Sequence, residues 1–293
     1  MNMKRIILLL AIFLIPSFAA AEEIALHQDI KARAAIVRSN RDGLWEKTLV
    51  VQFPRERRIL STNDGVLNTK AVANHSAHPQ LWNCSGDTMK TGHKMGAKVY
   101  MRDIKKRTAH NCGLGMENLA MMGTSADMDN LAVVTKAHHP FVVTALVTAG
   151  AKGNAVRTGV DEGSYVEADP ASVTPATSKE TKPGTINIIL LTNARVTDGG
   201  MVRAVITATE AKTAALEDLH VPSTYTKNAQ ATGTGTDGII IVSGSSGPLV
   251  TYPGGHSRIG GLMGKAVYEA VVEALGKQNG FKKSAQTGMG FKK

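Results

Sequence analysis

Strongly apolar runs alternate with helical repeats over residues 185–275 of the chain. Residues 186–192 (INIILLT) are apolar on both faces, which predicts a strand that is buried on both sides. Residues 238–244 (GIIIVSG) predict a second buried strand. Residues 199–219 and 257–275 instead repeat apolar positions at the spacing of a helix. The order strand, helix, strand, helix predicts a layered domain in which helices pack against a sheet.

Each predicted helix has an apolar stripe that should face the core. The stripe of the first helix, diluted by two threonines, consists of Val202, Val205, Ile206, Thr209, Thr213 and Leu216. The stripe of the second consists of Leu262, Met263, Ala266, Val267, Ala270, Val271 and Ala274. We expect Ser257 to be the N-cap of the second helix and Gly276 to end it.

The first half of the chain is richer in hairpins. Residues 44–61 predict two strands around a turn at Pro54, and residues 131–148 predict a hairpin across the sequence KAHHP. Residues 83–113 have no strong period and predict a loop, whereas a short helix is expected near 116–122. Together the two halves predict an α/β fold, with α+β as the alternative, in which helices flank a mixed central sheet.

The first 21 residues have the pattern of an export signal. Lys4 and Arg5 precede a short apolar run, and three alanines ending at Ala21 provide a small-residue cleavage site. The run is shorter than the roughly 20 residues of a bilayer span. We therefore expect a cleaved signal peptide over 1–21, a periplasmic or secreted protein and no stable membrane span. A retained anchor is the alternative.

The rest of the chain is expected to form a single domain over residues 22–276, followed by a disordered basic tail over 277–293. The net charge of +10 is dispersed without interleaved aromatics, and no nucleic-acid-binding signature occurs, so nucleic acid is not an expected partner. No metal-ligand spacing occurs, so no metal is expected. Whether Cys84 and Cys112 pair stays open, as does the oligomeric state.

A long polar segment lies directly before the strand at 186–192. Residues 161–184 contain three prolines and hardly any large aliphatic side chains. A loop of this length inside a domain is uncommon and usually has a function. It ends in Pro183-Gly184, and Thr185 follows at once. Thr185 is therefore a candidate nucleophile, and the alternative is an ordinary first residue of a buried strand.

Three segments concentrate Gly, Thr, Asn and Asp: 183–187 (PGTIN), 231–237 (ATGTGTD) and 254–260 (GGHSRIG). Their ends can meet at one edge of a sheet, where α/β sites form. The middle segment lacks the Lys and the following helix of a phosphate loop. It could be a tight turn or an active-site loop whose backbone N–H groups face an oxyanion. His256 is a candidate base or donor at a helix start, with a surface or capping histidine as the alternative.

The same segments carry a family resemblance. The runs PGTINIILLTNARVTDGG, ATGTGTDGIIIVSG and GGHSRIGGLMGKAV resemble the adenosylcobinamide amidohydrolase family. Upstream, ILSTNDGVLNTKAVANHSAHP, MMGTSADMDNLAVV and VTALVTAGAKGNAVRTG look like the same family in the same order. The resemblance covers roughly residues 47–275. It implies hydrolysis of the amide between a corrinoid side chain and aminopropanol, which gives adenosylcobyric acid for cobalamin salvage. The corrinoid is then the substrate, and no cofactor is implied.

A second, fainter resemblance concerns Thr185. The order of GTINIILLTNA, a helix, a Gly-rich turn ending in Asp237 and a buried strand is similar to the β-aminopeptidase and ornithine acetyltransferase group. Those enzymes cut their own chain before a Ser or Thr, which becomes an N-terminal nucleophile. The resemblance implies Thr185 as nucleophile, with or without self-cleavage, and a fold like that of N-terminal-nucleophile hydrolases. A free α-amine could then act as base for the hydroxyl. Asn187 shares a strand face with Thr185 and could orient the hydroxyl or the substrate amide.

The sequence thus predicts an exported, metal-independent amidohydrolase that acts on adenosylcobinamide-type corrinoids. Its predicted catalytic residues are Thr185, Asn187, Asp237 and His256. Its predicted substrate contacts are Asn74, Asn154, Asn193, Thr232, Thr234 and Thr236. The alternatives are a non-catalytic corrinoid-binding protein and an N-terminal-nucleophile amidase or peptidase with another substrate.

Overall fold

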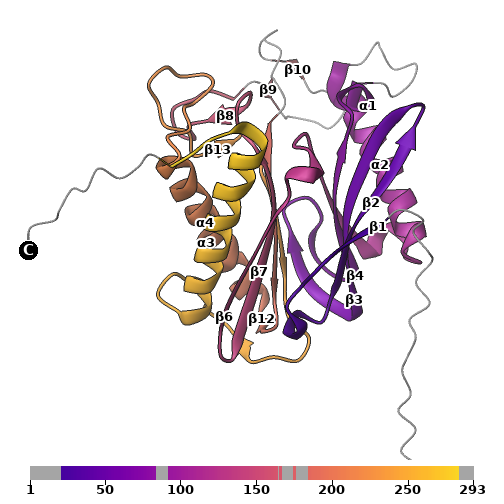
Figure 1. Cartoon of the computed structure of the whole chain (residues 1–293), viewed down its shortest axis with the longest axis vertical. Coiled ribbons are helices and arrows are strands. Elements are labelled where there is room, and N and C mark those ends of the chain that lie inside the picture. The colour runs from indigo at the N-terminus through magenta and orange to yellow at the C-terminus, as the bar shows by residue number, and fades with distance from the viewer. Residues whose placement is uncertain (1–20, 84–91, 164, 167–173, 176–183, 284–293) are drawn as a thin grey trace, which may run out of the picture.

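A computed structural model describes residues 21–83, 92–163, 165–166, 174–175 and 184–283. Its centre is a nine-stranded mixed sheet (Figure 1). The strands of this sheet are β1 (Ala21–Ile24), β2 (Arg33–Arg41), β3 (Leu44–Ser61), β4 (Gly65–Ala77), β5 (Leu119–Thr124), β6 (Ala132–His138), β7 (Phe141–Gly150), β11 (Thr185–Thr192) and β14 (Gly238–Val242). Their order is β1-β2-β3-β14-β11-β7-β6, and β4 pairs with both β3 and β5.

Four α-helices and several short elements complete the described part of the chain. The helices are α1 (Pro79–Asn83), α2 (Gly92–Asn111), α3 (Asp198–Asp218) and α4 (Arg258–Asn279). Single 3-10 turns occur at η1 (Gln28–Ile30), η2 (Met116–Asn118) and η3 (Met128–Asn130). The two-residue strands are β8 (Ala155–Val156), β9 (Tyr165–Val166), β10 (Thr174–Pro175), β12 (Arg195–Val196), β13 (Gly233–Thr234) and β15 (Leu249–Val250).

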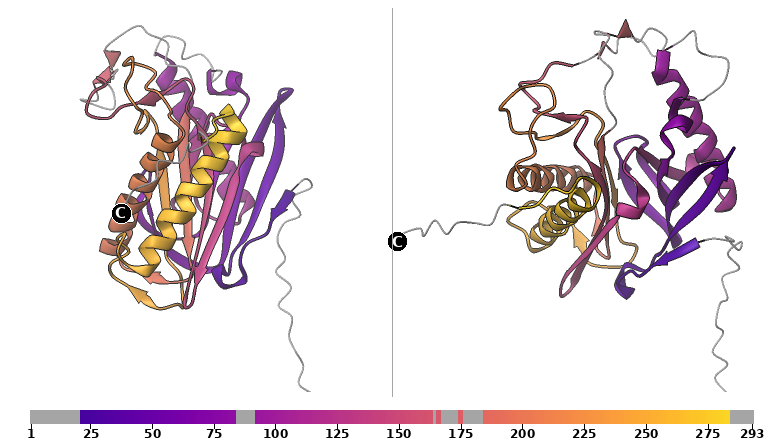
Figure 2. Two further views of the ribbon diagram at one scale, coloured as in Figure 1. Left: turned by 60° about the vertical axis from the view of Figure 1, so that its left-hand side comes forward. Right: turned by 45° about the horizontal axis from the view of Figure 1, so that its top comes forward.

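Helices cover the two outer sides of the sheet, which curls on itself. Helices α3 and α4 lie side by side against the half that contains β7, β11 and β14, and α2 lies against β4 and β5 (Figures 1 and 2). A further apolar cluster fills the space between the two halves, with members from β3, β4, β5, β7, β11 and β14. The sequence-based prediction of an α/β fold with a mixed sheet flanked by helices is confirmed. The finer expectation of a fold like that of N-terminal-nucleophile hydrolases stays a prediction.

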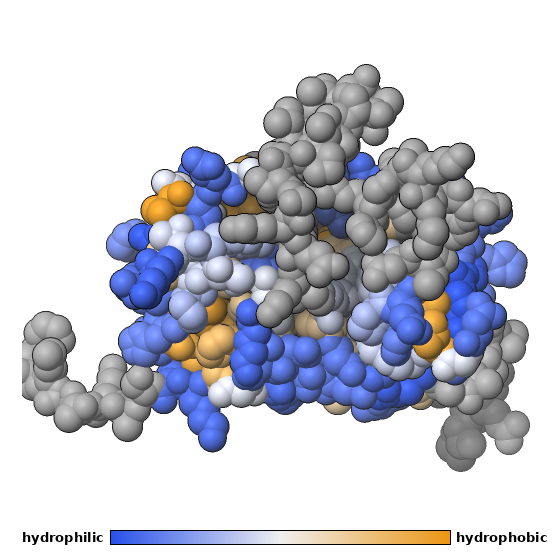
Figure 3. Space-filling model, turned by 90° about the horizontal axis from the view of Figure 1, so that it is seen from above, coloured by the Kyte–Doolittle hydropathy of each residue, from blue (hydrophilic) through white to orange (hydrophobic). Residues whose placement is uncertain are grey.

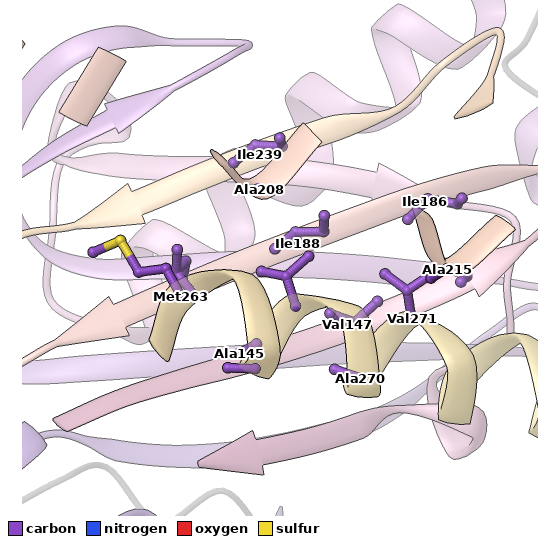
Figure 4. Packing of buried hydrophobic residues seen from close by; sticks show 14 of the residues in the cluster. Ala145, Val147, Ile186, Ile188, Ala208, Ala215, Ile239, Met263, Ala270 and Val271 are labelled. Carbon is purple, nitrogen blue, oxygen red and sulfur yellow. The ribbon is translucent and has the colours of Figure 1, made fainter. Parts of the chain in front are cut away.

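Strand β11 is the middle of the larger core. It pairs parallel with β14 and antiparallel with β7, and all eight of its residues are buried. Ile186 and Ile188 face α3 and α4, where they meet small and branched side chains of both helices (Figure 4). Ile189 points into the cluster between the two sheet halves. A strand buried on both faces needs apolar residues at nearly every position, which explains the run INIILLT.

The predicted face of α3 is wrong except at Leu216, which is buried, and Val205, which packs against the core. The buried positions of this helix are Gly200, Met201, Ala204, Thr207, Ala208, Lys212, Ala215 and Leu216. Val202 and Ile206, which were expected in the core, are exposed. Small side chains allow α3 to approach β14 and α4 closely, so the bulkier residues turn outward. For α4, Ser257 is the N-cap as predicted, but the helix continues past Gly276 and ends at Gly280, whose φ is 72°.

Three expectations for the first half are also corrected. Strand β3 is continuous, because a register shift between Gln52 and Arg57 accommodates Pro54. Residues 92–111 form α2, and Tyr100 and Ile104 fix it to the sheet although its sequence has a weak apolar period. Most of 116–122 belongs to β5, preceded by only the single turn η2. The hairpin of β6 and β7 is confirmed.

Several predictions fall outside the described residues. These are the signal peptide up to residue 20, Cys84 and therefore its pairing with Cys112, most of the polar segment 161–183, and the tail from residue 284 onward. In the part of the chain that is described, no helix has both the length and the apolar character of a membrane span.

Candidate active site

Thr185 and Asp237 meet because β11 and β14 are parallel strands joined through α3. Both residues lie at the amino end of a strand, and Asn187 stands opposite Gly238 in the register. The Thr185 hydroxyl donates to the carbonyl of Thr236 (2.7 Å), and the Ile186 N–H donates to Asp237 Oδ1 (3.0 Å). Two of the three Gly- and Thr-rich segments therefore converge as predicted.

The carbonyl oxygen of Gly184 lies at the centre of this convergence. It accepts hydrogen bonds from Asn154 Nδ2 (2.9 Å) and from the hydroxyl of Thr236 (3.0 Å). Tyr225 donates to Asn154 Oδ1 (3.0 Å), which fixes the orientation of the amide so that its NH₂ group faces Gly184. A Cβ on Gly184 would lie 2.9 Å from the carbonyl oxygen of Gly150 and 3.1 Å from the Cβ of Asn154. Only glycine fits this position without displacement of the backbone.

A buried ion pair supports the turn between β13 and β14. Lys212 on α3 contacts Asp237 Oδ2, and their side chains are 9 % and 16 % exposed. Asp237 also accepts from the hydroxyl of Thr234 (2.5 Å) and from its N–H (3.1 Å). The carboxylate thus binds α3, the turn and the start of β11 at once. We call Asn154, Gly184, Thr185, Lys212, Thr234, Thr236 and Asp237 the Thr185 cluster.

Asn187 extends the polar region along the same face of β11. Its Nδ2 donates to Asn74 Oδ1 (2.9 Å) on β4 and to the carbonyl of Gly123 (2.9 Å) on β5. Asn74 in turn donates to Thr148 (2.9 Å) on β7. Asn187 and Asn74 are both 2 % exposed, so this chain of amides is an internal network that adjoins the cluster.

Two predicted site residues lie at the other end of the sheet. Asn193 follows β11 at its carboxyl end, where it binds the backbone of Val142 and Pro140 in the β6–β7 hairpin. His256 is exposed and precedes the first turn of α4, whereas the last residue of α4, Asn279, contacts Ala151 beside the cluster (2.8 Å). A 22-residue helix is about 33 Å long, so His256 cannot reach Thr185. The prediction that the segment at 254–260 joins the same site is wrong.

The predicted oxyanion donors in the turn are also corrected. The backbone N–H groups of Thr232, Thr234, Gly235 and Thr236 already donate to acceptors within the protein. Thr232 accepts from the N–H of Thr158 (3.0 Å) through its hydroxyl, so its side chain binds the segment after β8. The donors that do converge on a carbonyl oxygen are side-chain groups of Asn154 and Thr236.

Sequence reasoning missed Lys212 and Tyr225. Lys212 follows Ala208 at the helical spacing of four, but the stripe predicted for α3 was the wrong one. Lys212 lies on the same helix face as Ala204 and Ala208, and this spacing could have indicated that it is buried. Tyr225 lies in an irregular segment, where no sequence pattern indicated its role.

The described surface at this end of the molecule is mainly hydrophilic with small apolar patches (Figure 3). Within the turn, Gly235 and Thr236 are exposed, so water reaches the cluster from this side. Among the residues that the structure describes, no three His, Cys, Asp or Glu side chains are grouped as metal ligands. The chemistry available here is that of hydroxyl, amide, ammonium and carboxylate groups.

A second buried polar group lies in the other half of the sheet. His75 contacts the hydroxyls of Thr48 (2.8 Å) and Tyr100 (2.9 Å), and Tyr100 donates to Glu46 (2.9 Å). Arg107 binds the same carboxylate (2.8 Å). Burial lowers the pKa of His75 to about 4, so the ring is neutral at pH 7. These contacts join β3, β4 and α2.

The protein is thus an α/β protein whose candidate site, the Thr185 cluster, surrounds the threonine hydroxyl at the start of a buried strand. A family model described as adenosylcobinamide amidohydrolase matches residues 29–283. The chain belongs to this family, and membership indicates a hydrolase.

Individual relatives add detail. An uncharacterized protein of Methanocaldococcus jannaschii is 42 % identical over 247 residues, which cover 82 % of this chain and 91 % of the relative. The adenosylcobinamide amidohydrolase of Methanosarcina mazei is 33 % identical over 114 residues, which cover 36 % of this chain and 51 % of that protein. The crystal structure of the PH0078 protein from Pyrococcus horikoshii OT3 is similar with a TM-score of 0.40 and 11 % identity, covering 84 % of both chains.

Proposed function

We propose that the protein hydrolyses the amide that links the corrinoid side chain of adenosylcobinamide to aminopropanol. The products are adenosylcobyric acid and free aminopropanol. Two observations support the proposal: the family match spans every residue of the Thr185 cluster, and a relative with partial coverage has this name. The observation that carries the chemistry is Thr185, a hydroxyl-bearing residue at the start of a buried strand, where its hydroxyl meets the turn before β14.

The proposed nucleophile is the hydroxyl of Thr185. It attacks the carbonyl carbon of the substrate amide, the C–N bond breaks, and aminopropanol leaves with the hydroxyl proton on its nitrogen. The acyl group remains as an ester on Thr185 until water hydrolyses it to the carboxylic acid and restores the hydroxyl. Asn154 and Thr236 are proposed to stabilise the oxyanion of each tetrahedral intermediate, because both already donate to one oxygen.

The other residues of the region have proposed supporting roles. Asp237, Lys212 and Thr234 hold the turn against β11. Asn187 and Asn74 line the face beyond Thr185 and are proposed to contact the substrate amide after a local rearrangement. Asn193 and His256 have no part in this proposal because they lie away from the cluster, and Thr232 has none because its hydroxyl binds the backbone of Thr158. No cofactor is proposed, since the corrinoid is the substrate.

A non-catalytic corrinoid-binding protein is the second candidate. The observation in its favour is that Thr185 is only 3 % exposed and its hydroxyl is bound to a backbone carbonyl. A hydroxyl held in this way needs a change of the adjacent chain before it can attack a substrate. Export to the periplasm or the medium suits either candidate and is proposed from the amino-terminal sequence.

Incubation of the purified protein with adenosylcobinamide distinguishes the two candidates. The amidohydrolase releases aminopropanol and adenosylcobyric acid in equal amounts, and Thr185→Val abolishes the release. Thr192→Val, at the other end of the same strand, is the matched control and should remain active. Tight binding of adenosylcobinamide without release of aminopropanol contradicts the proposal and favours the binding protein. Fractionation of the source cells tests export separately.

A further inference from the structure

We infer that the end of the molecule opposite the Thr185 cluster binds the surface of an anionic lipid bilayer. The parallel strands β11 and β14 have their carboxyl ends here, and the short strands β12 and β15 follow them (Figure 1). The inference goes beyond the proposed function, because it concerns a surface that takes no part in the hydrolysis.

Large apolar side chains are exposed at this end. Four of the eight exposed large hydrophobic residues in the described part of the chain come from α3 and from the segment around β15. They are Val202 (54 % exposed), Ile206 (46 %), Leu249 (61 %) and Tyr252 (54 %). Val202 and Ile206 are four residues apart and therefore lie on one face of α3. Single exposed apolar residues are ordinary on a protein surface, whereas a group of them indicates an interaction.

Contacts between α3 and the segment after β15 bring these side chains into one group. The guanidinium of Arg203 lies over the ring of Tyr252, 4.7 Å from its centroid. One turn further along α3, the hydroxyl of Thr207 donates to the carbonyl of Pro253 (3.0 Å). The segment 249–253 therefore runs beside the turns of α3 that carry the two exposed aliphatic side chains.

Exposed basic side chains surround the apolar group. Arg195 stands opposite Leu249 in the pairing of β12 with β15, and its Nε donates to the carbonyl of Gly247 (3.1 Å). The ammonium group of Lys31 contacts the hydroxyl of Ser246 (3.4 Å). The basic residues at this end are Lys31, Arg195, Arg203 and Arg258, and all four are exposed. We call these four and the four apolar residues the distal surface.

The positive charge of the distal surface is not neutralised by neighbours. The ion pairs formed among the described residues include none of its four basic side chains. The segment 244–258 contains no acidic residue. Asp198, in the first turn of α3, is already bound by Arg58 (2.7 Å). The charge is therefore available to an anionic partner.

A bilayer interface accommodates both kinds of side chain on the distal surface. Anionic headgroups attract Lys and Arg, tyrosine is enriched at the boundary between water and hydrocarbon, and exposed aliphatic side chains enter that boundary. A nucleic acid would match the basic residues but not Leu249, Val202 and Ile206. A symmetric contact with a second copy would place the same four cations opposite one another.

This mode of binding has a consequence for orientation. The Thr185 cluster lies at the amino end of β11, and the distal surface begins beyond its carboxyl end, about 23 Å away along the strand. A protein that rests on the bilayer through the distal surface holds the cluster on the side that faces the aqueous phase.

The test is sedimentation of the purified full-length chain with vesicles of phosphatidylcholine, with and without phosphatidylglycerol. We expect binding to the anionic vesicles only, and added salt should weaken it. Leu249→Ser combined with Tyr252→Ser should weaken binding by about tenfold or more, because two apolar side chains no longer leave water. Arg195→Gln and Arg258→Gln should weaken it by about fivefold each, because each loses one attraction to the headgroups.

Matched controls come from the loops beside the Thr185 cluster. Val160→Ser removes a side chain that is 56 % exposed, and Lys227→Gln removes an exposed cation. Both should bind the vesicles as the unmodified protein does. All variants keep the apolar run at residues 6–15, so a difference between them reports the distal surface alone. Circular dichroism during urea unfolding checks that each variant is folded.

Each outcome decides for or against the inference. Vesicle binding that is weakened in the distal variants and kept in both controls supports it. No binding, or equal binding by every variant, overturns it. Binding of a nucleic acid duplex that needs Arg195 and Arg258 but not Leu249 and Tyr252 assigns the surface to that partner and also overturns it. Self-association without vesicles that is lost in the same variants assigns the surface to a second copy and overturns it as well.

The proposed function is tested separately on the same samples. Aminopropanol release from adenosylcobinamide in solution should be equal for the unmodified protein and for the distal variants. A protein that binds vesicles through the distal surface but releases no aminopropanol supports this inference and contradicts the proposed function. A protein that releases aminopropanol and does not bind vesicles does the reverse.

Discussion

The two ends of strand β11 have similar residues and different surroundings. Thr185 begins the strand and Thr192 ends it, and both hydroxyls donate to a backbone carbonyl. At the other end, the side chains of Thr192 and of the next residue, Asn193, both bind the backbone of the β6–β7 hairpin. At the Thr185 end, side chains arrive from α3, from the loop after β7 and from the turn before β14.

The difference shows that a buried threonine is not informative by itself. At one end the hydroxyl and the amide complete the hydrogen bonds of a hairpin, which is a task of folding. At the other end two side-chain donors meet on one carbonyl oxygen next to a hydroxyl, which is more than the start of a strand requires. Convergence from segments distant in sequence, and not burial, distinguishes the candidate site.

The largest expected effect is a loss of hydrolytic activity when the threonine at the Thr185 end of β11 is replaced, with no loss when Thr192 at the other end is replaced. Thr185→Val keeps the shape of the side chain and removes the nucleophile, so aminopropanol release should fall by about 10⁴-fold or more. Thr192→Val makes the same chemical change about 23 Å away along the strand and should leave kcat within about twofold. Release rates with adenosylcobinamide under saturating conditions measure both. Equal losses in the two variants would remove the distinction between the ends.

Some features of the fold and of the candidate site could be predicted from the sequence, and others could not. The strands β11 and β14 were predictable because a strand buried on both faces must be apolar throughout. The meeting of Thr185 and Asp237 was predictable as well, because Thr185 begins one such strand and Asp237 directly precedes the other. The end of the sheet at which a helix begins could not be predicted. The periodicity of α4 indicates its buried face, but it does not indicate which end of the sheet lies next to its first residue. His256 was misplaced for this reason.

The face of α3 was misread for a different reason. Hydrophobicity favours Val202 and Ile206 over alanine, yet close packing of a helix between a strand and a second helix selects small residues. The wrong face concealed Lys212, the residue that pairs with Asp237. Similarly, α2 has too few apolar residues to show a period, and a few anchors such as Tyr100 and Ile104 hold it.

The second-largest effect should come from the ion pair that distinguishes the Thr185 end. Lys212→Met leaves the mostly buried carboxylate of Asp237 without its cation and should lower the free energy of unfolding by about 3–5 kcal/mol. Asp198→Asn breaks the exposed pair with Arg58 at the other end of α3 and should leave the free energy of unfolding almost unchanged, because water screens this pair. Urea unfolding followed by circular dichroism measures both variants. A cost below 1 kcal/mol for Lys212→Met would show that the pair does not organise the turn.

Acid sensitivity should arise away from both ends of β11, at His75. Burial lowers the pKa of His75 to about 4 from an unfolded value near 6.5, so the unfolded state binds the proton more readily. The free energy of unfolding is therefore unaffected by His75 above pH 6.5. It decreases as the pH falls from 6.5 to about 4, by about 3 kcal/mol in total. His75→Gln should flatten the profile in this range when unfolding free energies are compared at pH 7, 5.5 and 4.5. An unchanged slope would place the acid-sensitive group elsewhere.

The smallest effect concerns two asparagines that each donate through Nδ2 to a backbone carbonyl. Asn193→Ala removes the bonds to Val142 and Pro140 and should cost about 1–2 kcal/mol of stability without altering catalysis. Asn154→Ala also removes a bond to a carbonyl and should cost a similar free energy of unfolding, but the lost partner is Gly184. Its aminopropanol release should therefore fall far more than its stability. Parallel measurement of the unfolding midpoint and of release in both variants gives the comparison. If the two asparagines prove alike in both properties, convergence on Gly184 is a feature of folding, as at the hairpin.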